Sequence, residues 1–233
     1  MLTVPQKYLS DLLHLFYPHN CEGCGSDIVY DTQFLCSRCM HRLPATGFFS
    51  QQGNPTEKLF YGRLPVSSAA AAFYFTKDSL LQHLLVQLKY RNNKEAGYFL
   101  GRMMGYVLCA STRFSGVDVL VPLPLNPKKE FIRGYNQAAL ICEGIQEIWK
   151  KPVLSNAITR TRFTETQTKQ NRIARWQNME GVFEVTHPGQ LQGKQVLLVD
   201  DVITTGATLE ACGMAILAVP GCTLGIAAAA YTI

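Results

Sequence analysis

The feature that most constrains the fold of this chain is an apolar run that ends in two adjacent aspartates. Residues 196–209 have the sequence V-L-L-V-D-D-V-I-T-T-G-A-T-L, which indicates a strand, a short loop and a helix beginning at Thr208. Open α/β sheets bind ligands at the carboxyl ends of their parallel strands. The run therefore predicts such a sheet, with Asp200 and Asp201 at its ligand-binding edge.

The loop after the aspartates has the composition of a phosphate-binding loop. It offers consecutive backbone N–H groups and three hydroxyls at a helix N-terminus, where unpaired donors and the helix dipole favour an anion. Gly206 has no side chain to hold the backbone away from a phosphate. The loop residues are Thr204, Thr205, Gly206, Ala207 and Thr208. With the two carboxylates accepting hydrogen bonds from vicinal sugar hydroxyls, the expected ligand is a ribose 5-phosphate.

The same loop has three other interpretations. A Walker loop requires a lysine after the glycine, and Ala207 stands there instead. Magnesium-dependent phosphotransfer domains also place paired acids at a strand end, but they lack the Thr-Thr-Gly-Ala-Thr sequence. A purely structural pair would leave two adjacent carboxylates repelling each other. The residues favour recognition of a ribose phosphate.

Strand-like and helical patterns alternate through the rest of the chain. Strands are expected at 67–75, 117–121, 194–199 and 223–231, and helices at 80–88, 96–109, 134–150 and 208–218. Apolar strands separated by helices predict a mainly parallel sheet with helices on both faces.

Four of the eight cysteines form two C-x-x-C pairs separated by eleven residues. They are Cys21, Cys24, Cys36 and Cys39. Each pair can point two thiolates at one centre, and Gly25 permits the tight turn after the first pair. An all-sulfur tetrahedral shell suits a structural Zn²⁺ and leaves no open position for catalysis.

Two alternatives stand beside zinc: a redox dithiol and four buried apolar cysteines. His19 and His41 flank the pairs and could replace a ligand. The remaining cysteines are isolated in apolar surroundings, where we expect core packing. They are Cys109, Cys142, Cys212 and Cys222.

We expect three segments along the chain. Residues 1–45 should form an N-terminal helix and a four-cysteine zinc ribbon, with Leu9, Leu12, Leu13 and Phe16 on one helical face. Residues 46–65 are turn-rich and suggest a linker. Residues 66–233 should form the α/β domain.

The chain has a formal net charge of +5, and its charged residues are unevenly distributed along the sequence. Residues 1–65 carry five basic and five acidic side chains, a net of zero, and the 46 residues from Pro188 carry one against three, a net of −2. Residues 89–175 carry fifteen basic and six acidic side chains, a net of +9. This surplus suggests a polyanionic partner, either a phosphorylated small molecule or nucleic acid.

No segment reaches the roughly 20 apolar residues that a membrane-spanning helix needs. Asp11 and His14 interrupt any signal-peptide core near the N-terminus. We therefore expect a cytoplasmic protein without membrane insertion.

The aspartate loop resembles the phosphoribosyl-pyrophosphate (PRPP) motif of type I phosphoribosyltransferases. The other motifs are Leu88-Lys89-Tyr90, V-P-L-P-L at 121–125, R-G-Y-N-Q at 133–137, R-F-T-E-T-Q at 162–167, R-W-Q-N at 175–178, G-V-F at 181–183, and the cysteine pairs. Together these motifs resemble the ComF family of zinc-bearing phosphoribosyltransferase-like proteins. The likeness runs from about Leu15 to the C-terminus. Ile132 departs from the pattern, because an acidic or polar residue is common before Arg133-Gly134.

The resemblance implies a flavodoxin-like type I phosphoribosyltransferase fold that binds PRPP with Mg²⁺. It also implies a role in natural competence and DNA uptake, beside a competence helicase acting on single-stranded DNA. By position, Leu123-Pro124-Leu125 would form the pyrophosphate loop.

The residues predict a transfer site with named roles. We expect Asp200, Asp201 and Arg133 to be catalytic, and Pro124, Lys128 and Lys129 to bind substrate with residues 204–208. Departing pyrophosphate should emerge just beyond the second strand, where Lys128, Lys129 and Arg133 lie. The polar stretch 159–178 has the length of a lid. Its basic residues are Arg160, Arg162, Lys169, Arg172 and Arg175.

Two functions remain open at this point. The chain is either a phosphoribosyltransferase with an unidentified acceptor, or a non-catalytic accessory protein that binds single-stranded DNA and uses the site as a nucleotide sensor. Tyr135, Phe163 and Trp176 interleave with the basic residues and could stack on bases. No segment is assignable to nucleobase recognition.

Overall fold

A computed structural model describes residues 19–27, 33–161 and 181–232 of the chain. The predicted N-terminal helix lies outside the described residues, as does most of the predicted lid. The lid residues concerned are Arg162, Phe163, Lys169, Arg172, Arg175 and Trp176.

The centre of the molecule is a four-stranded, fully parallel sheet with the strand order β1-β6-β5-β2. Its strands are β1 (Ser68–Phe75), β2 (Val119–Pro122), β5 (Gln195–Ile203) and β6 (Thr223–Thr232). The two longest strands, β5 and β6, occupy the middle. β3 (Ile158–Arg160) and β4 (Phe183–Val185) form a separate antiparallel pair.

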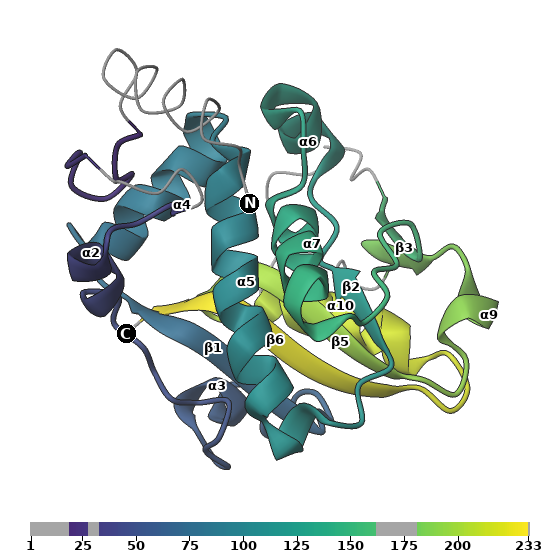
Figure 1. Ribbon diagram of the computed structural model, residues 1–233. Coiled ribbons are helices and arrows are strands. Elements are labelled where there is room, and N and C mark those ends of the chain that lie inside the picture. The colour runs from purple at the N-terminus through teal and green to yellow at the C-terminus, as the bar shows by residue number, and fades with distance from the viewer. Residues whose placement is uncertain (1–18, 28–32, 162–180, 233) are drawn as a thin grey trace, which may run out of the picture.

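Helices cover both faces of the sheet (Figure 1). The longer ones are α4 (Leu80–Tyr90), α5 (Lys94–Ala110), α7 (Gln137–Trp149) and α10 (Ala207–Leu217). The shorter ones are α2 (Ser37–His41), α3 (Pro55–Lys58), η1 (Thr112–Phe114), α6 (Pro127–Arg133) and α9 (Pro188–Leu191). None of the helices in the described part of the chain is long and apolar enough to cross a bilayer.

Successive side chains along each strand point to opposite faces of the sheet, so the core is divided into two layers. Leu197 and Val199 of β5 face α4, α5 and α7, whereas Val196 and Leu198 face α10. Because both faces of each central strand are covered, these strands are apolar over most of their length. The predicted α/β fold with helices on both faces is confirmed.

Helices α5 and α7 pack against each other unusually closely (Figure 1). A Cβ atom added to Gly101 would lie 2.2 Å from the carbonyl oxygen of Ile141, and one added to Gly144 would lie 2.3 Å from that of Tyr98. Only glycine permits this approach, so the two positions fix how α7 sits over the sheet.

Residues 46–65, expected as a linker, pack against the α/β core. Phe48, Phe60 and Leu64 are buried in the two layers. The fully buried Asn54 accepts hydrogen bonds from the first turn of α3 and donates one to the carbonyl of Ala69 in β1, at 2.8 Å. The division of the chain at residues 45 and 65 stays a prediction.

The expectation for the isolated cysteines is wrong for one of them. Cys142 and Cys212 are buried, and Cys222 is half-buried with its thiol donating to the carbonyl of Leu191 at 2.9 Å. Cys109 is exposed, because it lies on the outer side of α5 near the helix end. An apolar neighbourhood in sequence did not predict burial, since the helix turns that position away from the sheet.

Candidate functional site

The two aspartates lie on β5, between β2 and β6. The strand continues to Ile203, with Asp200 beside Ala228 and Ile203 beside Tyr231 of β6. The expectation that the strand ends at the aspartates was therefore wrong. Both carboxylates belong to the last residues of a central strand, and its pairing with β6 holds them in register.

Burial and the neighbouring negative charge both oppose ionisation of Asp200. Burial, and next the neighbouring Asp201 charge, raise the pKa of Asp200 to about 7. The backbone N–H of Asp201 donates to Oδ1 of Asp200 at 2.8 Å, and this bond and Lys89 lower the pKa. Lys89 Nζ lies 2.9 Å from Oδ2 of Asp201. Near neutral pH, Asp200 is therefore present in both protonation states.

The loop after β5 surrounds a small hollow of about 40 Å³. It is lined by Asp200, Val202, Ile203 and residues 204–209. Gly206 has a φ of +73°, and a Cβ atom there would lie 3.0 Å from the ring of Phe60. α10 begins at Ala207, one residue earlier than expected. Residues of the first helical turn thus line this hollow together with Asp200.

A larger cavity of about 190 Å³ opens beside this hollow. Its lining includes Lys89, Leu123, Pro124, Leu125, Lys129, Arg133, Asn136, Gln137, Ala138, Arg160, Asp200, Asp201 and Thr208. The structure therefore brings together the three predicted catalytic residues with Pro124, Lys129 and Thr208. Lys128 is exposed on α6 and, as far as the described residues define the two spaces, lines neither.

The segment after α6 positions Arg133 at the cavity. Gly134 ends α6 with a φ of +76°, and Asn136 caps α7 while donating to the carbonyl of Leu123 at 2.9 Å. Arg133 donates to Oε1 of Gln137 at 2.7 Å, and its guanidinium lies 5.4 Å from the ring centroid of Tyr90. The R-G-Y-N-Q motif is thus a turn that ties residues 123–125 to the arginine.

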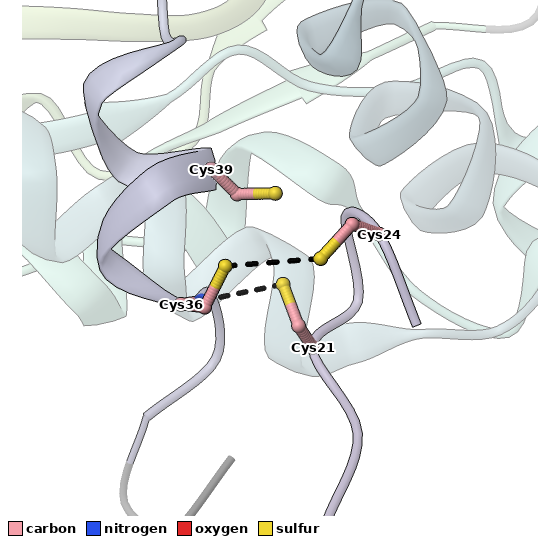
Figure 2. Close-up of side chains that lie close together, drawn as sticks. All are labelled: Cys21, Cys24, Cys36 and Cys39. Atoms are coloured by element: carbon pink, nitrogen blue, oxygen red, sulfur yellow. Dashed lines mark hydrogen bonds between the residues drawn. The ribbon is translucent and has the colours of Figure 1, made fainter. Parts of the chain in front are cut away.

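The four paired cysteines form one cluster. Their Sγ atoms all lie within 4.8 Å of one another, and Figure 2 shows them converging from two chain segments. Backbone N–H groups of Gly23 and Cys36 donate to Sγ of Cys21 at 3.4 and 3.2 Å. Gly25 has a φ of +69° in the turn after the first pair. Four convergent sulfurs with amide donors match the ligand set of a tetrahedral metal ion.

The cysteine thiols have contrasting surroundings. A hydrogen bond with Ser26 lowers the pKa of Cys24 to about 6, whereas burial raises the pKa of Cys39 to about 12. In the described residues neither His19 nor His41 joins the cluster, and His19 is instead within 2.8 Å of the carbonyl of Gln33. The cysteines alone supply the ligand set.

Comparisons with known proteins decide the family. A model of the phosphoribosyl transferase domain matches residues 144–232. DNA utilization protein YhgH of Escherichia coli K12 is 31% identical over 192 residues, which are 81% of this chain and 74% of that protein. Competence protein F of Haemophilus influenzae is 27% identical over 191 residues, 82% of this chain and 75% of that protein. The chain belongs to the ComF family.

Among the solved structures matched is glutamine PRPP amidotransferase from B. subtilis, complexed with ADP and GMP. It is 16% identical with a TM-score of 0.42, and the match covers 60% of this chain and 30% of that one. For this ComF-family chain, the domain match and the parallel sheet confirm the predicted type I phosphoribosyltransferase fold, with a four-cysteine cluster towards the N-terminus.

Sequence reasoning missed one residue of this candidate site. Lys89 appeared only within the Leu88-Lys89-Tyr90 motif, with no role attached. A lysine that ends an amphipathic helix is ordinarily a solvated charge, so the sequence carried no signal that it meets Asp201. The structure brings them together because α4 lies against the same face of the sheet.

The raised pKa of Asp200 predicts a pH dependence of folding stability. The unfolded chain releases this proton near pH 3.8 and the folded protein near pH 7, so stability from this group is present at low pH and lost as the pH rises. Asp200→Asn removes the titration. We expect the free energy of unfolding of the variant, relative to that of the wild type, to rise by on the order of 2 kcal/mol between about pH 5.5 and about pH 8.

Urea unfolding of both proteins at several pH values, without ligand, measures this difference. Glu184→Gln, at an exposed position of β4, serves as the control and should track the wild type. A difference between Asp200→Asn and wild type that does not change with pH would contradict the assignment.

Proposed function

We propose that this ComF-family chain binds PRPP, or another ribose 5-phosphate group, together with Mg²⁺. One observation carries the proposal: a loop of N–H donors at the start of α10 and a half-buried acidic pair line adjoining spaces at one end of β5. Phosphate suits the donors, and vicinal hydroxyls suit the acids.

The lining residues suggest one orientation of the ligand. The 5-phosphate would lie at residues 204–208, and its ribose hydroxyls would donate to Asp200 and Asp201. The pyrophosphate would then lie between residues 123–125 and the cations Lys129 and Arg133. Lys128, which is exposed, would act only on a ligand that extends beyond this cavity.

Transfer of the phosphoribosyl group would place positive charge on the sugar while pyrophosphate leaves. Mg²⁺, bound with PRPP, would supply charge neutralisation at the leaving group. Lys129, Arg133 and Lys89 add fixed cations beside it, and the acidic pair faces the sugar. We therefore propose pentosyl transfer from PRPP as the reaction of this site.

Replacing both site acids should strongly weaken PRPP binding. Each charge-assisted hydrogen bond contributes roughly 1.5–3 kcal/mol, so Asp200→Asn/Asp201→Asn should weaken Mg²⁺-dependent binding by about a hundredfold or more. Calorimetric titration of PRPP measures the effect, and Glu184→Gln is the matched control. If the wild type shows no affinity for PRPP or ribose 5-phosphate, the proposal fails.

We further propose that the four-cysteine cluster holds a structural Zn²⁺. Its four sulfurs would complete a tetrahedral shell. Cys21 and Cys39 are buried in the same core layer as Phe34 and Leu35, so the ion would tie this layer together.

Removing the cluster should remove the metal. Cys21→Ser and Cys36→Ser should reduce zinc from about one ion per chain to background and lower the thermal midpoint, because ligand binding contributes to folding. Elemental analysis and thermal scans measure both. Cys109→Ser, at the exposed isolated cysteine, should keep the zinc. Equal zinc content in all variants would contradict the site.

A second function rests on the surface of α6 and its surroundings. Lys128, Lys129 and Phe131 are exposed, and the guanidinium of Arg133 lies 5.4 Å from the ring centroid of Tyr90. Cations interleaved with aromatic rings suit single-stranded nucleic acid. The relatives named for DNA utilization and competence point the same way, to an accessory role in DNA uptake. A helicase partner and a cytoplasmic location stay predictions.

Measuring binding over a series of salt concentrations tests single-stranded DNA binding separately from PRPP binding. If α6 contacts the DNA backbone, Lys128→Ala/Lys129→Ala should weaken single-stranded DNA binding and reduce the salt slope by about 1.4, roughly 0.7 for each lost phosphate contact. Fluorescence anisotropy with an oligonucleotide measures it. Lys58→Ala/Lys77→Ala, two exposed lysines outside α6, is the control. Unchanged slopes would argue against this surface.

A further inference from the structure

The four cysteines of the cluster differ in their access to solvent. One member of each C-x-x-C pair is buried, with Cys21 only 2% and Cys39 only 1% exposed. The other member of each pair is accessible, because Cys24 is exposed and Cys36 is half-buried. A small oxidant in solution therefore reaches one sulfur of each pair before the other.

The two accessible sulfurs lie next to each other, although they belong to different pairs. Cys24 Sγ is 3.7 Å from Cys36 Sγ, and Figure 2 shows the two side chains pointing toward each other from separate segments. A disulfide bond requires a sulfur–sulfur distance of about 2 Å. Residues 24–27 are all exposed, so closing this gap moves a surface turn rather than the core.

The two buried sulfurs are held by their surroundings. Cys21 Sγ accepts hydrogen bonds from the backbone N–H groups of Gly23 and Cys36. Cys39 Sγ lies only 3.0 Å from the position that a Cβ atom on Gly23 would take. Both buried cysteines belong to the same core layer as Leu35. A disulfide within either C-x-x-C pair would draw a sulfur out of these contacts, whereas a disulfide between the accessible sulfurs would not.

We propose that Cys24 and Cys36 form an oxidation site, at which a peroxide joins the two C-x-x-C pairs through a disulfide between their accessible members. Cys24 Sγ attacks one oxygen of the peroxide, the O–O bond breaks, and its electron pair leaves on hydroxide. Cys24 is then a sulfenic acid. Cys36 Sγ attacks this sulfur, the S–O bond breaks, and a second hydroxide leaves. The two thiol protons convert both hydroxides to water, so the sulfurs lose two electrons and hydrogen peroxide is reduced to water.

This disulfide would withdraw one ligand of each pair from the proposed zinc site. The two sulfurs left behind cannot complete a tetrahedral shell, so oxidation should release the metal. Thiol reductants reverse disulfides by exchange, so the change should be reversible. The oxidation site does not depend on PRPP binding, and only its zinc readout rests on the proposed function.

The test maps the disulfides of the reduced wild-type full chain after treatment with hydrogen peroxide and alkylation of the free thiols. Cleavage at Glu22, Asp27 and Arg38 places the four cysteines on separate peptides for mass spectrometry. We expect the Cys24–Cys36 disulfide to exceed either within-pair disulfide by about tenfold or more, because the other two sulfurs are shielded. A chromogenic chelator should record zinc release in step with this disulfide, and dithiothreitol should remove the disulfide.

The control is Cys109→Ser, which removes an exposed cysteine outside the cluster and should leave the yield of the Cys24–Cys36 disulfide unchanged. A main disulfide within either pair, or cluster thiols that stay reduced while Cys109 is oxidised, would overturn the oxidation site. Wild-type protein that forms the Cys24–Cys36 disulfide but contains no zinc overturns only the proposed metal. Bound zinc without this disulfide overturns only the oxidation site.

Discussion

The acidic pair beside Lys89 is the interaction on which the arrangement of the site depends. Two adjacent carboxylates in a central strand repel each other, and burial opposes their charge, as the raised pKa of Asp200 shows. Lys89 and the backbone N–H of Asp201 offset part of that cost. The pair is tolerated because β5 is held between β2 and β6, whose pairing fixes the carboxylates at the edge where the loop begins. A strand free to slip would move them apart from the lysine.

The phosphate-type loop is supported from a distant part of the chain. The ring of Phe60 packs beneath Gly206, and Arg63 donates to the carbonyl of Thr205 at 3.1 Å while pairing with Glu210 of α10. α3, just before these residues, is anchored by the buried Glu57, which pairs with Arg113. Residues 46–65 therefore set the shape of the loop, although their turn-rich sequence suggested only a connection.

The parts of the structure that the sequence predicted are those with a contiguous signal. Residues 196–209 contain a strand, a loop and a helix start in one stretch. The spacing within each C-x-x-C pair by itself predicts that its two thiols converge on one centre. The pairing of Lys89 with Asp201 and the exposure of Cys109 depend on how α4 and α5 pack, which no local pattern records. The cavity lined by Lys89, Tyr90, Lys129 and Arg133 joins two segments about 40 residues apart, so no local sequence pattern could predict its lining.

Helix α4 connects the metal cluster to the proposed PRPP site. At its start, Leu80 packs against Gly23 between the first two cysteines, so closely that a Cβ atom on Gly23 would lie 2.9 Å from it. At its end, Lys89 reaches Asp201. The intervening Leu84 and Leu88 are buried in the same layer as Cys39. Because a packed helix moves as a unit, the position of the cysteine cluster constrains where the lysine stands. The cluster is therefore part of the support of the site, although no cysteine lines either cavity formed by the described residues.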